Sequence, residues 1–176
     1  MKIMPTISNT TDNVTTAANQ QERLVLSGWI VGFVDGEGYF GVSVCRNTST
    51  RYGKQILPEF VVTQSIKSLS SLQQIQKFFK CGRIYVNHRH DNHHDDIYRY
   101  CVRNLEELHQ IIIPFFRTYA LQTSKRNDFE LFDQVVSRMI CKVHYSIEGM
   151  DNLITYIHQS KTRILNDYTH NTRPNA

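Results

Sequence analysis

The chain has 176 residues, of which 40% are hydrophobic, 11% aromatic and 20% charged, and this composition excludes an intrinsically disordered or fibrous protein. A chain of this length supports one domain with a core of its own. The formal net charge of +4 permits binding to nucleic acid without requiring it, so the distribution of the basic residues has to decide.

Residues 1–20 are rich in Thr, Asn, Gln and Ser and show almost no apolar periodicity, so we expect a disordered leader, which is too poor in Arg for a transit peptide. No uninterrupted apolar run reaches the roughly 20 residues that a transmembrane helix needs, so we expect no membrane partner. The four cysteines contain no CxxC pair, which favours reduced structural thiols over a zinc site.

The first predicted element is a helix that is buried on most sides, because apolar residues are nearly continuous from Leu24 to Val34. Gly28, Gly32 and Gly36 recur every four residues and therefore share one face. Each glycine costs roughly 1 kcal/mol inside a helix, so a stripe of them favours the close approach of another backbone. A kinked or flexible segment is the alternative.

This helix ends in IVGFVDGEG, which puts the acids Asp35 and Glu37 where a helix carries partial negative charge. Two carboxylates at that end repel it unless a cation lies beside them. The motif therefore predicts a neighbouring cation, which the run itself does not supply.

Strand periodicity follows the motif. Phe40, Val42 and Val44 alternate with small or polar residues, and after a polar loop over 48–54 the alternation resumes from Gln55 to Thr63, which predicts a long hairpin. A second hairpin is predicted over 84–86 and 97–102, and its loop holds the polar cluster HRHDNHHDD.

Helical spacing is found over 69–79, over 105–115 with a stop at Pro114, over 125–140 and over 150–158. The element order predicts an α+β domain over 21–163, in which helices cover one face of a four-stranded antiparallel sheet, followed by a polar tail over 164–176. The other sheet face is too polar for a core and is a candidate binding surface.

The motif resembles that of the LAGLIDADG homing endonucleases, and the element order is similar to their αββαββα core, here with additional C-terminal helices. Further similar segments are VTQ at 62–64, CG at 81–82, the run 108–115 and TSKRNDFELF at 123–132. The segment SKTR at 160–163 is similar to a C-terminal segment of the family's single-motif algal branch, and the resemblance spans residues 24–163.

The resemblance implies a homodimer, because the family brings two motif helices together and this chain has one motif. It assigns Gly28, Trp29, Gly32 and Asp35 to the subunit interface, where we expect Asp35 to cap or brace the interface. A two-fold protein reads a target with matching approximate palindromy, so the implied partner is a long pseudopalindromic double-stranded DNA.

The resemblance also implies Mg²⁺-dependent phosphodiester hydrolysis, with Mn²⁺ or Ca²⁺ able to substitute for binding. The Glu37 carboxylate and the Gly36 carbonyl match the family's metal ligands, and Gln64 matches a residue that orients water. Lys125, with Arg126 as the alternative, matches a basic residue near the scissile phosphate. The ordinary alternatives are a solvated turn carboxylate at Glu37 and surface roles for Gln64 and Lys125.

A two-stranded ribbon fits the major groove of DNA, where base edges are distinguishable. On this basis the exposed sheet face and nearby basic residues are predicted to bind DNA, and for each of them surface solvation is the alternative. The predicted DNA-binding set is Ser43, Cys45, Arg46, Asn47, Arg51, Lys54, Gln55, Leu57, Glu59, Val61, Thr63, Tyr85, Asn87, Asp96 and Tyr98, with Ser160, Lys161 and Arg163 near the C-terminus.

We expect the His-rich loop 88–96 to face DNA, because a native metal site there would need a geometry that a short polar loop does not fix. The resemblance implies that the gene lies in an organellar intron, with a chloroplast favoured over a mitochondrion. Two alternatives use the same fold without cutting: an RNA-binding intron maturase and a DNA-binding regulator.

Overall fold

The computed structural model describes residues 10–88 and 96–171. In chain order its helices and strands are α1 (Thr10–Glu37), β1 (Gly38–Arg46), β2 (Lys54–Ser65), α2 (Leu69–Phe79), β3 (Arg83–Asn87), β4 (Ile97–Val102), α3 (Leu105–Glu107), α4 (Ile113–Thr118), α5 (Lys125–Ile140) and α6 (Ile147–Asn171). The α+β class and the two hairpins are as predicted. Along the described stretches no helix combines the length and hydrophobicity that crossing a bilayer requires.

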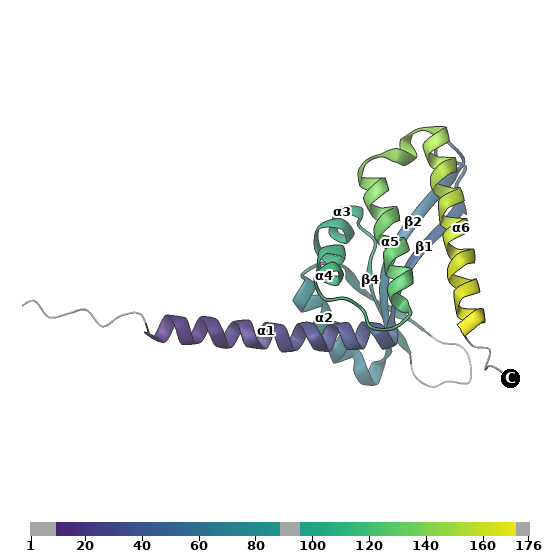
Figure 1. Cartoon of the computed structure of the whole chain (residues 1–176). Coiled ribbons are helices and arrows are strands. Elements are labelled where there is room, and N and C mark those ends of the chain that lie inside the picture. Colours follow the sequence, from purple (N-terminus) through teal and green to yellow (C-terminus); the bar gives the residue numbers. More distant parts are fainter. Residues whose placement is uncertain (1–9, 89–95, 172–176) are drawn as a thin grey trace, which may run out of the picture.

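Helix α1 is longer than predicted. It begins at Thr10, so the expected disordered leader is wrong for residues 10–20, while residues 1–9 lie outside the described stretches of the chain. Figure 1 shows this N-terminal half of α1 projecting beyond the rest of the domain. Adding residues to an existing helix is far easier than nucleating one, so the segment 26–34, whose inner face is buried, supports a polar extension that has no apolar period of its own.

The sheet has the strand order β1-β2-β4-β3, with every neighbouring pair antiparallel. Strand β1 is therefore an edge strand, and the β1–β2 and β3–β4 hairpins meet where β2 pairs with β4. One face carries Phe40, Val42, Phe60 and Val62, which are all buried, and packs against the helices. The opposite face is turned away from the core.

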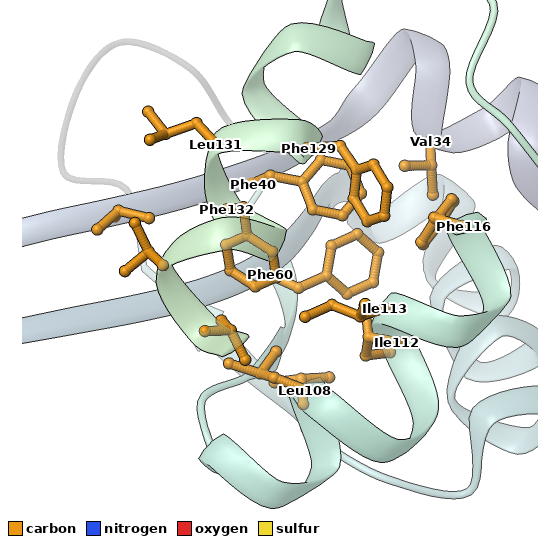
Figure 2. Close-up of a cluster of buried hydrophobic side chains, with 14 of the residues drawn as sticks. Val34, Phe40, Phe60, Leu108, Ile112, Ile113, Phe116, Phe129, Leu131 and Phe132 are labelled. Atoms are coloured by element: carbon orange, nitrogen blue, oxygen red, sulfur yellow. The ribbon is translucent and has the colours of Figure 1, made fainter. Parts of the chain in front are cut away.

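The core is built largely from aromatic rings. The Phe40 ring lies 5.0 Å from the Phe60 ring, and it makes edge contacts with Phe116 at 5.2 Å, Phe129 at 5.2 Å and Phe132 at 5.5 Å. Figure 2 shows these rings between strand and helix, with Val34 of α1 at the same cluster. Such pairs add about 0.5–1.5 kcal/mol each beyond area burial, so this cluster anchors the motif helix and α5 to the sheet.

The helix predicted to stop at Pro114 does not stop there. The chain runs from α3 through a π-helical turn (Leu108–Ile112) into α4, and Pro114 lies in the first turn of α4. Proline cannot donate to the carbonyl four residues back and its ring crowds that carbonyl, and the wider π turn just before it removes the conflict. Burial of Leu108, Ile112, Ile113 and Phe116 favours continuing the helix.

Helix α6 extends past the predicted polar tail. It runs to Asn171, and Ile164 is buried against the core, so the expected domain end at residue 163 is too early. Figure 1 shows α6 beside α5. The apolar residues Met150, Leu153, Ile157 and Ile164 recur at helical spacing and join the core, which explains the length of this helix.

Candidate active centre and nucleic-acid interface

Glu37 is the last residue of α1, and its side chain is exposed. The chain passes from helix to strand without a linker, because Gly38 is already the first residue of β1. A Cβ at Gly38 would lie 2.7 Å from the Val34 carbonyl oxygen and as close to the Val34 side chain, so only glycine allows this exit. The junction holds Glu37 at the end of a helix that is anchored in the core.

Asp35 is engaged within its own chain. Its carboxylate accepts the backbone N–H of Gln122 at 2.8 Å, the backbone N–H of Thr123 at 3.2 Å and the Thr123 hydroxyl at 2.7 Å. Burial acts to raise the pKa of the Asp35 carboxyl, but these hydrogen bonds and the charge of Lys125 outweigh it and hold the pKa below its ordinary value of 3.8. Asp35 thus ties the end of α1 to the segment that leads into α5.

That segment delivers Lys125, the first residue of α5. Its ammonium group donates to the carbonyl oxygen of Gly38, directly after Glu37. Strand β1 is at the sheet edge, so its outward carbonyl groups have no neighbouring strand. Lys125 satisfies one of them and thereby places a positive charge beside the motif, as the two acids at the helix end require.

Lys161 of α6 makes the same kind of contact further along the edge strand, where its ammonium donates to the Val42 carbonyl oxygen at 2.6 Å. Asp128 lies near both lysines. Burial raises the pKa of the Asp128 carboxyl above its ordinary value of 3.8, although the charges of Lys125 and Lys161 act to lower it. The edge of β1 therefore carries a line of charged groups that starts at the motif.

The oxygen atoms at the end of α1 suit a hard cation. Glu37 supplies an exposed carboxylate, and the Gly36 carbonyl belongs to the last helical turn, where carbonyl groups lack intrahelical partners. Within the described ranges no three His, Cys, Asp or Glu side chains are close enough to hold a metal ion together. Mg²⁺ needs only one or two carboxylates and completes its shell with water and substrate oxygens, so this donor set fits it.

Gln64 lies near the end of β2, two residues beyond Val62, the pairing partner of Gly38. It pairs with Tyr98 of β4 and is half-buried. Its side chain therefore lies on the same face as Tyr98 and opposite to Arg99, and its water-orienting role stays a prediction.

Among the described residues, none packs against the glycine face of α1. Gly28, Gly32 and Gly36 are exposed, and a Cβ added to any of them would meet nothing within 4 Å. Val25, one turn before Gly28 on the same side, is 65% exposed. This face points away from the buried Ile30 and Val34, so it is available to a partner of the domain.

The exposed face of the sheet follows from the strand register. Ser43 pairs with Leu57, Cys45 with Gln55, and Thr63 with Arg99, which also pairs with Tyr85. Most of the predicted reading set therefore shares one face: Ser43, Cys45, Gln55, Leu57, Glu59, Val61, Thr63, Tyr85 and Asn87. Asn47 lies just past β1, and its amide donates to the Gln55 side chain at 2.7 Å.

Three of the predicted DNA contacts are wrong for a direct contact. Tyr98 lies on the opposite face and packs against the core, because the register of β4 with β2 and β3 turns Arg99 towards the exposed face. Val61 is on the expected face but only 2% exposed. Ser160 is buried, because it lies on the side of α6 that meets the domain.

The predicted basic contacts differ in their surroundings. Lys54 forms an ion pair with Asp151 of α6 at 2.8 Å, which fastens the tip of the first hairpin to that helix. The Arg51 guanidinium lies 5.4 Å from the Tyr52 ring, and Arg46 and Arg163 are exposed. The His-rich loop falls mostly on residues 89–95, outside the described ranges; at its borders, the His88 ring lies 2.8 Å from the Asp96 carboxylate.

Sequence patterns missed three residues on the exposed sheet face. Tyr39 follows the motif and lies across Gly41, where an added Cβ would strike its ring. Arg99 and Arg103 flank Glu59 at 3.9 Å and 2.9 Å. Alternation along β4 places Arg99 and Tyr98 on opposite faces, but only the pairing with β2 tells which face is exposed.

An antiparallel sheet with one exposed polar face, entered by a helix that ends in an acid, is an arrangement that suits nucleic-acid binding. Residues 30–136 match the family model described as LAGLIDADG endonuclease, and the chain belongs to this family.

Individual relatives agree with the family match. The protein described as probable intron-encoded endonuclease 3 of Neurospora crassa is 33% identical over 132 residues, which are 74% of this chain and 24% of that protein. The chain thus spans about a quarter of that relative's length.

Solved structures match as well. The crystal structure of the homing endonuclease I-TnaI is 32% identical, with a TM-score of 0.67 over 80% of this chain and 96% of that one. The structure of I-SmaMI bound to an uncleaved DNA target in the presence of calcium ions is also 32% identical, with a TM-score of 0.67 over 74% of this chain and 43% of that one.

Proposed function

We propose that this chain is a site-specific double-strand DNA endonuclease that acts as a homodimer with a divalent metal ion and promotes the mobility of the intron that encodes it. The observation that carries the proposal is the junction of α1 and β1. There the exposed carboxylate of Glu37 lies next to a lysine-tethered carbonyl and at one end of the exposed sheet face.

The homodimer is supported by the empty glycine face. Gln21, Val25, Gly28, Gly32 and Asp35 follow one another at alternating intervals of four and three residues, which is the spacing of a helix–helix seam. Two copies of α1 packed along this seam approach closely, because the glycines have no side chains. Both ends then bring a Glu37 toward a common centre, one for each DNA strand.

The chemistry divides between the metal ion and the residues of the chain. A bound Mg²⁺ supplies activation of water and neutralisation of charge on the attacked phosphate. Glu37 and the Gly36 carbonyl are the ligands that this chain offers. The Lys125 ammonium, tethered at Gly38, places a second positive charge near the scissile phosphate, and Gln64 orients water by hydrogen bonding. The I-SmaMI complex that contains calcium supports a divalent ion in the family, and magnesium is our assignment.

We assign DNA recognition to the exposed sheet face. The basic residues assigned to the phosphate backbone of the DNA are Arg46, Arg51, Lys54, Lys161 and Arg163. The DNA-bound relative supports DNA as the partner. The name of the Neurospora crassa relative supports a gene that lies within an intron. We further assign this intron to an organelle and favour the chloroplast over the mitochondrion. The two non-cleaving alternatives, a maturase and a regulator, have no use for an exposed acid at the helix end.

The test is selection of cleaved sequences from a randomised double-stranded DNA library in the presence of Mg²⁺. We expect a long consensus with approximate two-fold symmetry, and no products with the Glu37→Gln variant. Binding without cleavage by the wild-type protein would favour the regulator, and RNA binding without DNA selection would favour the maturase. An asymmetric consensus would contradict the homodimer.

A further inference from the structure

Three charged side chains meet on the exposed face of the sheet. The Glu59 carboxylate of β2 lies 2.9 Å from Nε of Arg103 and 3.9 Å from Nη2 of Arg99, and each arginine faces a different carboxylate oxygen. The Glu59 side chain is 22% exposed, whereas those of Arg99 and Arg103 are 38% and 57% exposed. A ligand that approaches this face therefore meets the guanidinium groups before it meets the acid.

The two arginines occupy different levels of the half-site. Arg99 pairs with Thr63, the residue after the partner of Gly38, so it lies at the level of the junction that carries Glu37. Arg103 directly follows β4 on the side away from that junction. Four residues of strand span on the order of 13 Å, so Arg99 faces the region of the target nearest the cleavage site and Arg103 a more distal region.

The surroundings hold Arg103 and Glu59 in place. Arg103 lies over the Tyr85 ring, 5.9 Å from its centroid, and its hydrogen bond to Glu59 raises the pKa of the guanidinium. Beneath the cluster Val61 and Cys101 pair with each other and are 2% and 4% exposed. The cluster therefore has an apolar floor, which keeps its side chains from folding into the sheet.

Glu59 itself is a poor candidate for reading a base. A carboxylate recognises cytosine by accepting from its amino group, but one Glu59 oxygen accepts a hydrogen bond from Arg103 and the other faces Arg99 at an ion-pair distance of 3.9 Å. A guanidinium that is oriented by a carboxylate keeps donors on its far edge, and a fork of donors matches the O6 and N7 acceptors of guanine. Arg99 lies in the middle of the face, and the Glu59 carboxylate, which is held by a hydrogen bond from Arg103, attracts the Arg99 guanidinium at an ion-pair distance of 3.9 Å.

We propose that Arg99 recognises a guanine in the cleavage-proximal region of each half-site and that Glu59 acts as a positioning residue that orients the Arg99 guanidinium. This inference rests on the proposed function, since it names a specificity determinant of the same DNA-binding face. The two-fold arrangement predicts that the guanine occurs at a symmetric pair of positions in the target.

The experiment compares base preference at every position of the selected target for the wild-type protein, Arg99→Ala, Glu59→Gln and Lys77→Ala. Lys77 is exposed on α2, on the helix side of the sheet, so its variant removes one positive charge without touching the reading face. Target sequences are selected in parallel for binding and for cleavage, and thermal unfolding checks that each variant is folded.

We expect Arg99→Ala to reduce the preference for guanine at one symmetric pair of positions by between about 5-fold and 150-fold, the range for loss of one bidentate base contact. Glu59→Gln is expected to relax the same pair of positions, whereas Lys77→Ala leaves the profile unchanged. If Glu59 reads cytosine directly, Glu59→Gln instead shifts a different pair of positions towards adenine, because glutamine pairs with adenine.

An Arg99→Ala profile identical to that of the wild-type protein would overturn the inference, and so would uniform weakening at all positions, which indicates a phosphate contact. A shift to adenine at a separate position in Glu59→Gln would overturn the role of Glu59. The proposed function fails by a different result, namely a wild-type protein that selects no DNA sequence in either assay.

Discussion

The substitution Gly32→Leu separates the stability of one chain from its association with a second. Inside this chain an added Cβ at Gly32 meets nothing within 4 Å, and the residue is exposed. Leucine is a better helix former than glycine, so the free energy of unfolding of the monomer is expected to rise by about 0.5–1 kcal/mol.

The dimer is expected to respond in the opposite direction. If two copies of α1 pack along the glycine face, each new leucine enters a close backbone contact, and overpacking of this kind costs about 1–3 kcal/mol per site. The two-fold axis doubles the effect to about 2–6 kcal/mol per dimer, which weakens association by roughly 30-fold to 10⁴-fold. Cleavage is expected to fall with it, since the centre needs both copies of Glu37.

The assay is sedimentation equilibrium over a range of concentrations, combined with thermal unfolding of the monomer. The wild-type protein should approach twice the chain mass of 20.6 kDa, and Gly32→Leu should approach the chain mass. The matched control is Arg23→Leu on the same helix, because Arg23 is turned towards Phe78 of its own chain, 5.8 Å from the ring centroid. A Gly32→Leu protein that dimerises as tightly as the wild-type protein would refute the interface, as would a wild-type monomer that cuts both strands.

Three further predictions concern the active centre. Glu37→Gln should abolish cleavage while leaving DNA affinity in Ca²⁺ nearly intact, and gel-shift and cleavage assays on one target check this; equal loss of binding would count against a metal ligand. Asp35→Asn keeps one acceptor but sets an amide NH₂ against a backbone N–H, so it should lower the free energy of unfolding by about 1–2 kcal/mol. The control is Glu130→Gln, which removes an exposed ion pair with Arg126 and should lower the free energy of unfolding by no more than about 0.5 kcal/mol. Because the folded-state pKa of Asp35 is depressed, its contribution is present above the ordinary value of 3.8 and is lost as pH falls through the folded-state value, so the two proteins should converge in stability in acid; a difference that persists there would contradict the assignment. Lys125→Met removes the ammonium at the Gly38 carbonyl and should reduce the single-turnover cleavage rate more than DNA affinity. Loss of affinity alone would instead mean that Lys125 only contacts the phosphate backbone of the DNA.

Local patterns in the sequence were sufficient for most of the elements. The bounds of α2 and α5 agree with those expected from helical spacing, and β4 spans the predicted residues 97–102. Burial forces these periods on the chain, since a residue that faces the core must recur every 2 or 3.6 positions. The predictions were wrong for segments that have no period of their own. The N-terminal half of α1 is helical because it extends a helix whose inner face is buried, and the chain stays helical at Pro114 because the flanking Ile112 and Ile113 are buried.

The candidate site divides in the same way. The sequence by itself determined the family motif, with Glu37 at the end of a glycine-striped helix, because the whole motif lies within one continuous stretch of chain, the end of α1 and the first residue of β1. Only the tertiary structure decided that Asp35 holds the Thr123 segment, that Lys125 is tethered to Gly38, and that Arg99 rather than Tyr98 faces outward. Each of these depends on the pairing of distant segments, and a one-residue change of register turns every side chain of a strand to the other face, which no local pattern records.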